Sequence, residues 1–194
     1  MQSNTARVAQ VFWGLLIVAV DLRAGRFDVL PDFVGYILIA LGAAGLVGWS
    51  SHFQTARLVS WSLVPIPIAL LLFSGVFLKV LGLINLVLEG ALMWFLLGGV
   101  IAFAQSRSRQ HWVDSARNYR WAYLGLIGVA LFTSLIASAV PSLARVIASI
   151  TLVATLVVLA AILYLLHQVK GEAAKSTASP APSTQQDETV KEAA

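Results

Sequence analysis

The sequence predicts an all-α fold, a polytopic transmembrane helix bundle of about six spans. Hydrophobic residues make up 59% of the 194 residues and charged residues 11%, with a mean hydropathy of +0.84. Soluble domains carry about 25% charged residues, so water is not the main solvent of this chain. The chain also contains six mostly apolar stretches, and a helix needs roughly 20 such residues to cross a hydrocarbon core of about 30 Å.

Each apolar stretch predicts one span, and together they predict a membrane domain over residues 1–170. At the start of the second span, Pro31 suits a first helical turn and Asp32 complements the positive end of the helix. In the third span, Pro65 and Pro67 remove two backbone donors, so we expect that helix to bend or break. The expected spans are residues 5–23, 31–49, 58–77, 80–104, 121–140 and 143–166.

Polar segments follow the fourth span and the sixth. Residues 105–120 are expected to form the only substantial interior loop, in which arginines alternate with aromatic residues. Such side chains attract anionic lipid headgroups and are also common anchors for a partner protein. We therefore expect a lipid headgroup or partner contact at Arg107, Arg109, Trp112, Arg117 and Arg120. Residues 171–194 are rich in Ala, Ser, Thr, Pro and Gln, which cannot bury a core, so a disordered cytoplasmic tail is expected.

Glu89 is the first candidate for a functional residue, because an ionisable side chain inside an apolar helix costs a few kcal/mol. Asn85 lies four residues earlier, so the two side chains share one helix face and can form a small polar pocket. In a six-span bundle, the charged first loop lies at the same end as the start of the fourth span. The candidate polar membrane site therefore consists of Asn85, Glu89, Asp21, Arg23, Arg26, Asp28 and Asp32.

Three interpretations of Glu89 are open. In a structural one, Glu89 pairs with Arg23, Arg26 or Lys79, accepts a hydrogen bond from Asn85 and fixes how the helices meet. In a functional one, Glu89 belongs to a site for an ion, a proton or a small solute. In the third, Glu89 faces lipid. A functional site predicts a water-accessible cavity that reaches Glu89 or Asn85, whereas a purely structural or interaction role predicts a dry and satisfied interior.

Other classes of function have little support in the sequence. The absence of cysteine excludes thiol catalysis and cysteine-ligated metals. The histidines His52, His111 and His167 are not spaced as ligands, so we expect no metal site and no cofactor. No phosphate-binding loop, zinc-protease helix or serine elbow occurs, so we expect no catalytic residues and no enzyme activity. The basic excess lies outside the apolar stretches, which favours lipid contact over nucleic-acid binding.

One segment resembles a known pattern. Residues 21–38, DLRAGRFDVLPDFVGYIL, lead from a loop of mixed charge through Leu-Pro-Asp, an aromatic residue and Gly-Tyr into the second span. This motif resembles one found in a family of uncharacterised bacterial multi-pass membrane proteins. The resemblance covers this segment alone, implies a bacterial inner-membrane setting and implies no mechanism. Physically, Phe27, Phe33 and Tyr36 are expected to anchor at the headgroup level.

The sequence thus favours an integral membrane protein that moves a small solute or an ion. The alternative is a non-catalytic subunit or scaffold of a membrane protein complex. The expected partners are the lipid bilayer with its anionic headgroups, and either another membrane protein or further copies of the chain.

The distribution of basic residues predicts the orientation. In a six-span arrangement, the side with the N-terminus, the second and fourth loops and the tail holds nine basic residues, and the other side holds four. Basic loops stay in the cytoplasm, so both termini are expected there, with the chain in the inner or plasma membrane. Reporter fusions to the C-terminus should be active as cytoplasmic fusions. An external C-terminus would refute the orientation.

Overall fold

The computed structural model describes residues 4–19, 23–24, 27–28, 32–72, 76–137 and 139–178. Apart from one antiparallel pair of two-residue strands, the regular elements of these residues are α-helices, which confirms the predicted all-helical class. The elements are α1 (Asn4–Ala19), β1 (Arg23–Ala24), β2 (Phe27–Asp28), α2 (Asp32–Leu46), α3 (Ser51–Leu63), α4 (Pro65–Leu72), α5 (Val76–Ser106), α6 (Gln110–Ile136) and α7 (Pro141–Ala178).

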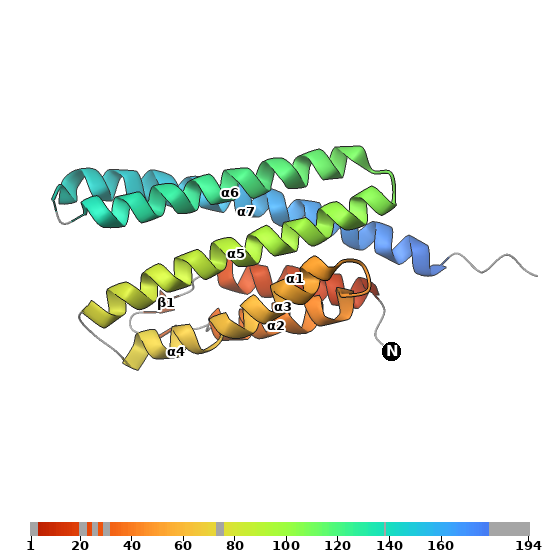
Figure 1. The fold of residues 1–194 in the computed structure, drawn as a ribbon, viewed down its shortest axis with the longest axis horizontal. Coiled ribbons are helices and arrows are strands. Elements are labelled where there is room, and N and C mark those ends of the chain that lie inside the picture. The colour runs from red at the N-terminus through yellow and green to blue at the C-terminus, as the bar shows by residue number, and fades with distance from the viewer. Residues whose placement is uncertain are drawn as a thin grey trace, which may run out of the picture.

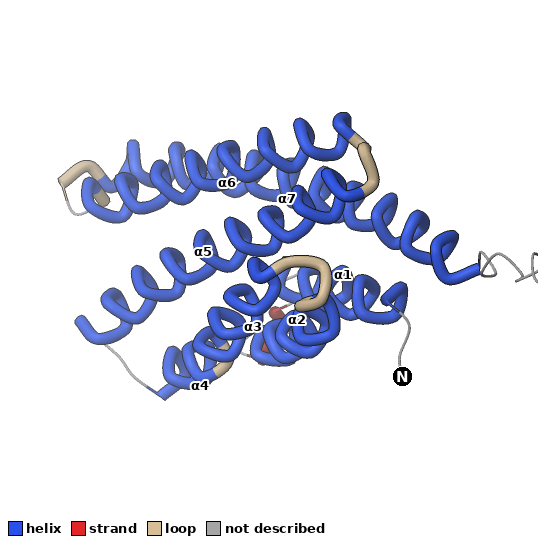
Figure 2. Tube along the Cα trace, turned by 45° about the vertical axis from the view of Figure 1, so that its right-hand side comes forward, coloured by secondary structure: helices blue, strands red, loops and turns tan. Residues whose placement is uncertain are grey.

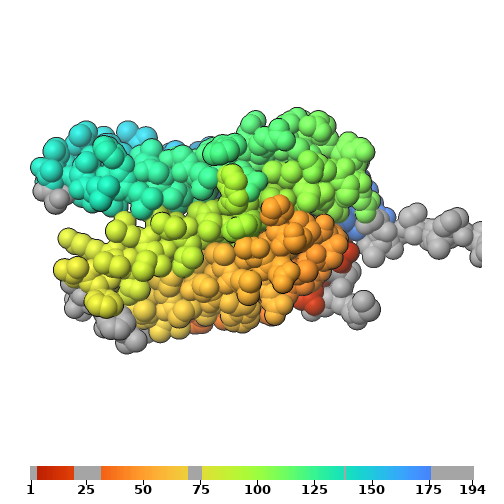
Figure 3. Space-filling model, viewed as in Figure 1, coloured from red at the N-terminus to blue at the C-terminus, as the bar shows by residue number. Residues whose placement is uncertain are grey.

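The helices form a closed ring in which each packs against two neighbours. The order around the ring is α1, α2, α3, α5, α6 and α7, and α7 packs back against α1. The short α4 continues α3 and contacts α2, α3 and α5. The long helices α5, α6 and α7 run along the molecule, and the shorter α1, α2 and α3 lie together on one side of α5 (Figure 1). On the face shown in Figure 3, α5 lies between α3 and α4 on one side and α6 on the other.

Three helices in the described part of the chain are long and apolar enough to cross a membrane. They are α5, α6 and residues Pro141–Lys175 of α7. The apolar helices α1 and α2 have 16 and 15 residues, which correspond to about 24 and 22 Å of helix. The structure therefore shows helices of the length and apolar character that a membrane span requires, whereas the number of six spans stays a prediction.

The chain is interrupted between α3 and α4 at the two prolines, as the sequence predicts. Pro65 is the first residue of α4, where a helix leaves the backbone donor unpaired in any case, and Pro67 lies in the same turn. The α3 helix begins at Ser51, earlier than the predicted span. Its start is set by Ser50, whose hydroxyl oxygen accepts a hydrogen bond from the backbone N–H of His52 at 3.2 Å.

The predicted interior loop over residues 105–120 is wrong. The α5 helix continues to Ser106 and α6 begins at Gln110, so the connection is only residues 107–109, with Ser108 in the left-handed region at a φ of 53°. The polar residues of this segment form the first turns of α6 instead. They can do so because the segment contains no glycine or proline and places Val113 and Ala116 on one buried face.

The start of the predicted tail is also wrong. Residues 171–178 continue α7 as helix, and Ala173 is buried against the bundle. Residues 179–194, the rest of the predicted tail, lie outside the described residues.

The connections between helices gather at two ends of the bundle. One end holds the start of α1, residues 47–50, residues 107–109 and the last turns of α7. Residues 137 and 139–140 lie at the other end (Figure 2). We call the first the basic end, because Arg7, Arg107, Arg109, Lys170 and Lys175 belong to its segments. These segments are the ones that the orientation hypothesis assigns to the cytoplasm.

Glycines bring α1 and α2 into close contact. A Cβ atom on Gly14 would lie 2.6 Å from the carbonyl oxygen of Gly35, and a Cβ on Gly35 would lie 2.7 Å from the carbonyl oxygen of Gly14. A Cβ on Gly42 would lie 2.8 Å from the carbonyl oxygen of Arg7. The two backbones therefore touch along most of their length, which is how small residues favour helix association in lipid.

Replacing Gly14 with alanine should separate α1 from α2, because the opposing atom is backbone and cannot rotate away. We expect a loss of about 1–3 kcal/mol, typical of overpacking, seen as a lower thermal midpoint of the protein in detergent. Gly128→Ala in α6 is the matched control, because nothing lies within 4 Å of its Cβ position. Equal midpoints for the two variants would contradict the close contact.

Candidate functional site

A carboxyl group inside the ring joins two helices that are not adjacent. Glu89 lies near the middle of α5, and its Oε1 accepts hydrogen bonds from the Tyr36 hydroxyl at 2.6 Å and from Asn85 Nδ2 at 2.8 Å. Tyr36 belongs to α2, and α3 lies between α2 and α5 in the ring. The hydrogen bond from Tyr36 to Glu89 therefore crosses the interior of the bundle.

Helix periodicity explains why these three side chains meet. Asn85 and Glu89 are one turn apart on α5, so their side chains lie one above the other. Tyr36 follows Asp32 by one turn on α2, and its neighbours on the buried face include Ile39 and Ala43. Tyr36 is only 1% exposed, and a buried tyrosine hydroxyl requires a hydrogen-bond partner. Glu89 is that partner.

The polar groups of this cluster are not all satisfied within the described chain. Both hydrogen bonds to Glu89 end on Oε1, and neither uses Oε2. The Oδ1 atom of Asn85 is buried and has no hydrogen-bond partner among the described residues. A polar network gains most stability when its members are fully satisfied, and this cluster joins α2 and α5 without reaching that state.

A cavity of about 220 Å³ lies beside Glu89 and reaches five of the helices. We call it the Glu89 cavity, and it is lined by Leu15, Val18 and Ala19 of α1, Tyr36 and Ile39 of α2, Glu89, Leu92 and Met93 of α5, Tyr123 of α6, and Leu152, Thr155, Leu156 and Leu159 of α7. Its volume exceeds the space that one water molecule requires. The single charge-bearing side chain that lines it is Glu89.

The chemistry of this arrangement follows from the surroundings of the carboxyl group. A carboxylate in an apolar interior is costly unless a proton or a cation neutralises it or several donors surround it. Here the described donors are one phenol and one amide. The cavity is therefore suited to hold a proton or a cation against Glu89.

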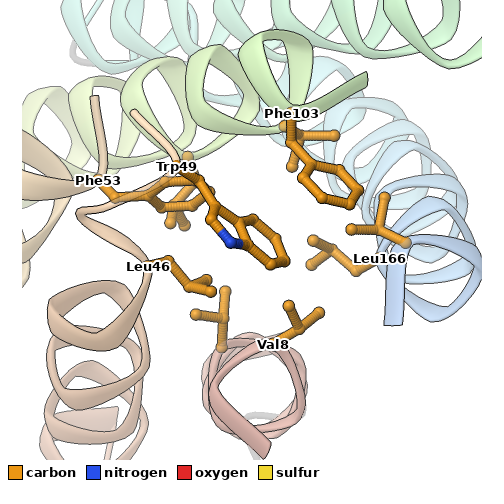
Figure 4. Close-up of a pocket in the computed structure, with 10 residues that line it drawn as sticks. Val8, Leu46, Trp49, Phe53, Phe103 and Leu166 are labelled. Atoms are coloured by element: carbon orange, nitrogen blue, oxygen red, sulfur yellow. The ribbon is translucent and has the colours of Figure 1, made fainter. Parts of the chain in front are cut away.

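A tightly packed apolar cluster closes the bundle between the Glu89 cavity and the basic end. On α5, residues 89–93 line the cavity, and residues 96–103, which are nearer the basic end, belong to the cluster. On α1 and α7 too, the residues of the cluster are nearer the basic end than those of the cavity. Trp49 stacks on Phe103 with ring centroids 4.1 Å apart. The labelled side chains of Val8, Leu46, Phe53 and Leu166 point toward them (Figure 4). The space left among them is about 10 Å³, at or below the space that one water molecule needs. We call this cluster the apolar plug.

The structure brings together part of the predicted polar site. Asn85 and Glu89 are hydrogen-bonded, and Asp32 lies one turn before Tyr36 on α2. Arg23 and Asp28 are opposite each other in the strand pair, and only their backbone is described. Asp21 and Arg26 lie outside the described residues. The predicted alternative of a Glu89–Lys79 pair is not found, because Lys79 is exposed in the first turn of α5 and the partners of Glu89 are Tyr36 and Asn85.

The predicted headgroup or partner residues divide into separate groups. Arg109 Nη2 forms an ion pair with Glu172 Oε1 at 2.9 Å, and its guanidinium lies 5.7 Å from the ring centre of Trp112. Arg107 lies 5.6 Å from the ring centre of Phe103, and Arg117 is exposed on α6. Arg107 and Arg109 belong to the basic end, whereas Arg117 lies about two turns into α6.

Arg120 lies farther along α6 and belongs to a different environment. Its guanidinium carbon is 3.1 Å from the ring centre of Trp94 on α5, and Trp94 packs edge-on against Trp121 with centroids 5.3 Å apart. The five residues therefore lie in more than one environment, and their contact with lipid headgroups or a partner stays a prediction. The helical start of α6 moves Arg120 about 15 Å along the axis from Gln110.

Sequence reasoning missed Tyr36, Tyr123 and Thr155 as residues of the site. Tyr36 was expected at the headgroup level, yet Tyr36 and Tyr123 are only 1% and 8% exposed and line the Glu89 cavity. The expectation for Tyr36 is wrong because its helix face packs inward. The available signal was the spacing of Tyr36, Ile39 and Ala43, which marks one buried face of α2.

No protein-family model, curated protein or solved structure matches this chain. Among the described residues, no group of three or more histidine, aspartate or glutamate side chains is placed to hold a metal ion.

Tyr36→Phe should weaken the contact between α2 and α5, because it removes the hydroxyl that donates to Glu89 at 2.6 Å. We expect a loss of about 1–3 kcal/mol in the free energy of unfolding, measured by denaturant titration in detergent. Tyr164→Phe is the control, since Tyr164 is exposed on α7. If both variants unfold at the same denaturant concentration as the unsubstituted protein, the hydrogen bond contributes nothing to stability.

Proposed function

We propose that this chain is a multi-pass protein of a bacterial inner membrane that moves a small solute or ion through the Glu89 cavity. The observation that carries the proposal is a partly buried carboxyl group beside a cavity of about 220 Å³ among five helices. Ionisable residues that face a cavity inside a helical membrane bundle mark the pathways of ions, protons and substrates.

The membrane setting is supported by the long helices. The α5, α6 and α7 helices are apolar and exceed the length that a bilayer core requires, and many of their large apolar side chains are exposed. Such a surface is stable in contact with lipid and not in contact with water. We further propose six spans, formed by α1, α2, α3 with α4, α5, α6 and α7, because these helices close one ring.

The charge of the Glu89 cavity favours a cation over an anion. Glu89 is its one ionisable carboxyl group, and no lysine or arginine lines it. An anion would meet repulsion from Glu89 without a compensating positive charge. A proton or a small cation is therefore the most favourable cargo.

The alternative role, a non-catalytic subunit or scaffold, is favoured by different features. Arg117 and the exposed apolar faces of α6 and α7 are available to a partner protein. That role requires no cavity at Glu89, and its interior polar groups would be satisfied. Crosslinking and recovery in mild detergent distinguishes the two roles, because only a subunit is recovered with a stoichiometric partner.

Glu89→Gln should abolish transport while the protein still folds, because glutamine keeps the size and hydrogen-bonding capacity of the side chain and loses its charge. The measurement is the current across a solid-supported membrane, driven by gradients of protons, Na⁺, K⁺ or small organic cations. We expect this current to fall by about tenfold or more, which corresponds to the loss of one charge-assisted interaction. Glu172→Gln is the control, since Glu172 lies on α7 and pairs with Arg109 outside the cavity.

The result separates a working site from a structural one. If Glu89→Gln is expressed and folded like the unsubstituted protein but carries no current, transport through the cavity is supported. If the current of Glu89→Gln equals that of the unsubstituted protein, or if the substitution only lowers thermal stability, the transport proposal is wrong.

A further inference from the structure

We infer that the Glu89 cavity binds a small organic cation with an aliphatic body, of the alkylammonium class. This inference rests on the proposed function and specifies its substrate class. It follows from the composition of the cavity wall, from the number of oxygen atoms available in it, and from its volume.

The wall of the cavity is mostly aliphatic. Nine of its thirteen lining residues are Leu, Ile, Val, Ala or Met, and these surround the one carboxyl group. A bare or hydrated inorganic ion gains nothing from such a wall. An aliphatic chain gains about 0.8 kcal/mol for each methylene that it buries there, which is about fourfold in affinity.

The oxygen atoms in the cavity are too few to coordinate a divalent cation that has lost its water. Glu89, Tyr36, Tyr123 and Thr155 supply the polar side chains, and the hydroxyl of Thr155 already donates to the carbonyl oxygen of Thr151 at 2.8 Å. A cation such as Ca²⁺ takes about six to eight oxygen ligands, and Mg²⁺ requires an octahedron. An ammonium group requires only a few acceptors, and Glu89 Oε2 is not used by the hydrogen bonds from Tyr36 and Asn85.

Two aromatic rings lie on the wall with the carboxyl group. Tyr36 of α2 and Tyr123 of α6 both line the cavity. Aromatic faces attract organic ammonium groups, and a carboxylate among aromatic residues combines charge neutralisation with cation–π attraction. The cavity thus offers a charged end for the ammonium and an aliphatic end for the chain.

The volume sets the size of the ligand. A cavity of about 220 Å³ is smaller than the roughly 300–1,000 Å³ of typical ligand pockets. A short primary amine in its protonated form fits this space, whereas a long chain or a polycyclic cation does not.

Binding of a homologous series to the purified full-length protein tests this inference. Calorimetry with ethyl-, butyl-, hexyl- and octylammonium should give affinities that rise about fourfold per methylene until the cavity is full, and then fall. Alcohols of the same chain lengths should bind at least about tenfold more weakly, because they lack the charge. Glu89→Gln should lose the preference for ammonium over alcohol, and Glu172→Gln should keep it.

A second variant keeps the test valid if Glu89→Gln does not fold. Leu159→Phe enlarges a side chain on the cavity wall and should shift the best-binding amine to a shorter chain. An unchanged optimum in this variant, or equal binding of alcohols and ammonium ions to the unsubstituted protein, overturns the inference.

Failure of the inference is distinguishable from failure of the proposed function. If no alkylammonium binds while protons or inorganic cations still carry a Glu89-dependent current, the substrate class is wrong and transport stands. If alkylammonium binds in a Glu89-dependent manner and no current or uptake of labelled amine follows, the binding site stands and transport is wrong.

Discussion

The hydrogen bond from Tyr36 to Glu89 is the interaction on which the interior of this bundle depends. It places a carboxyl group among apolar side chains, where such a group is costly unless it has partners. The bond forms because α2 is held close to α1 by the contact of Gly14 with Gly35, the residue before Tyr36. That contact fixes α2, α2 directs Tyr36 inward, and Tyr36 holds Glu89 at the edge of the cavity.

The interior is divided into two parts of opposite character. Around Glu89 the side chains leave a cavity with a few polar groups, and toward the basic end Trp49 and Phe103 stack inside a nearly void-free apolar plug. Under the proposed function, an ion bound at Glu89 would meet this plug toward the basic end, and passage in that direction would require Trp49, Phe103 and their neighbours to move. The described side chains are thus closely packed between Glu89 and the basic end.

Much of the fold could be predicted from the sequence, because apolar length and proline positions act locally. The break at Pro65 and the one-turn spacing of Asn85 and Glu89 are examples. The extent of α6 could not be predicted from the sequence, because its first turns are polar and their helical state depends on burying Val113 and Ala116 against the bundle. The roles of Tyr36 and Tyr123 could not be predicted either, since these residues are about ninety apart in the chain and line one cavity only when the ring of helices closes.

The unequal helix lengths have a consequence for the surrounding lipid. The described parts of α1 and α2 have 16 and 15 residues, whereas α5 and α7 have 31 and 38, so in a membrane these helices would present apolar surfaces of different height. A bilayer adapts to such a mismatch by thinning beside short helices and by tilting long ones, at a cost of fractions of a kcal/mol per Å. In the proposed membrane setting, the bilayer is therefore expected to be thinner beside α1 and α2 than beside α5 and α7.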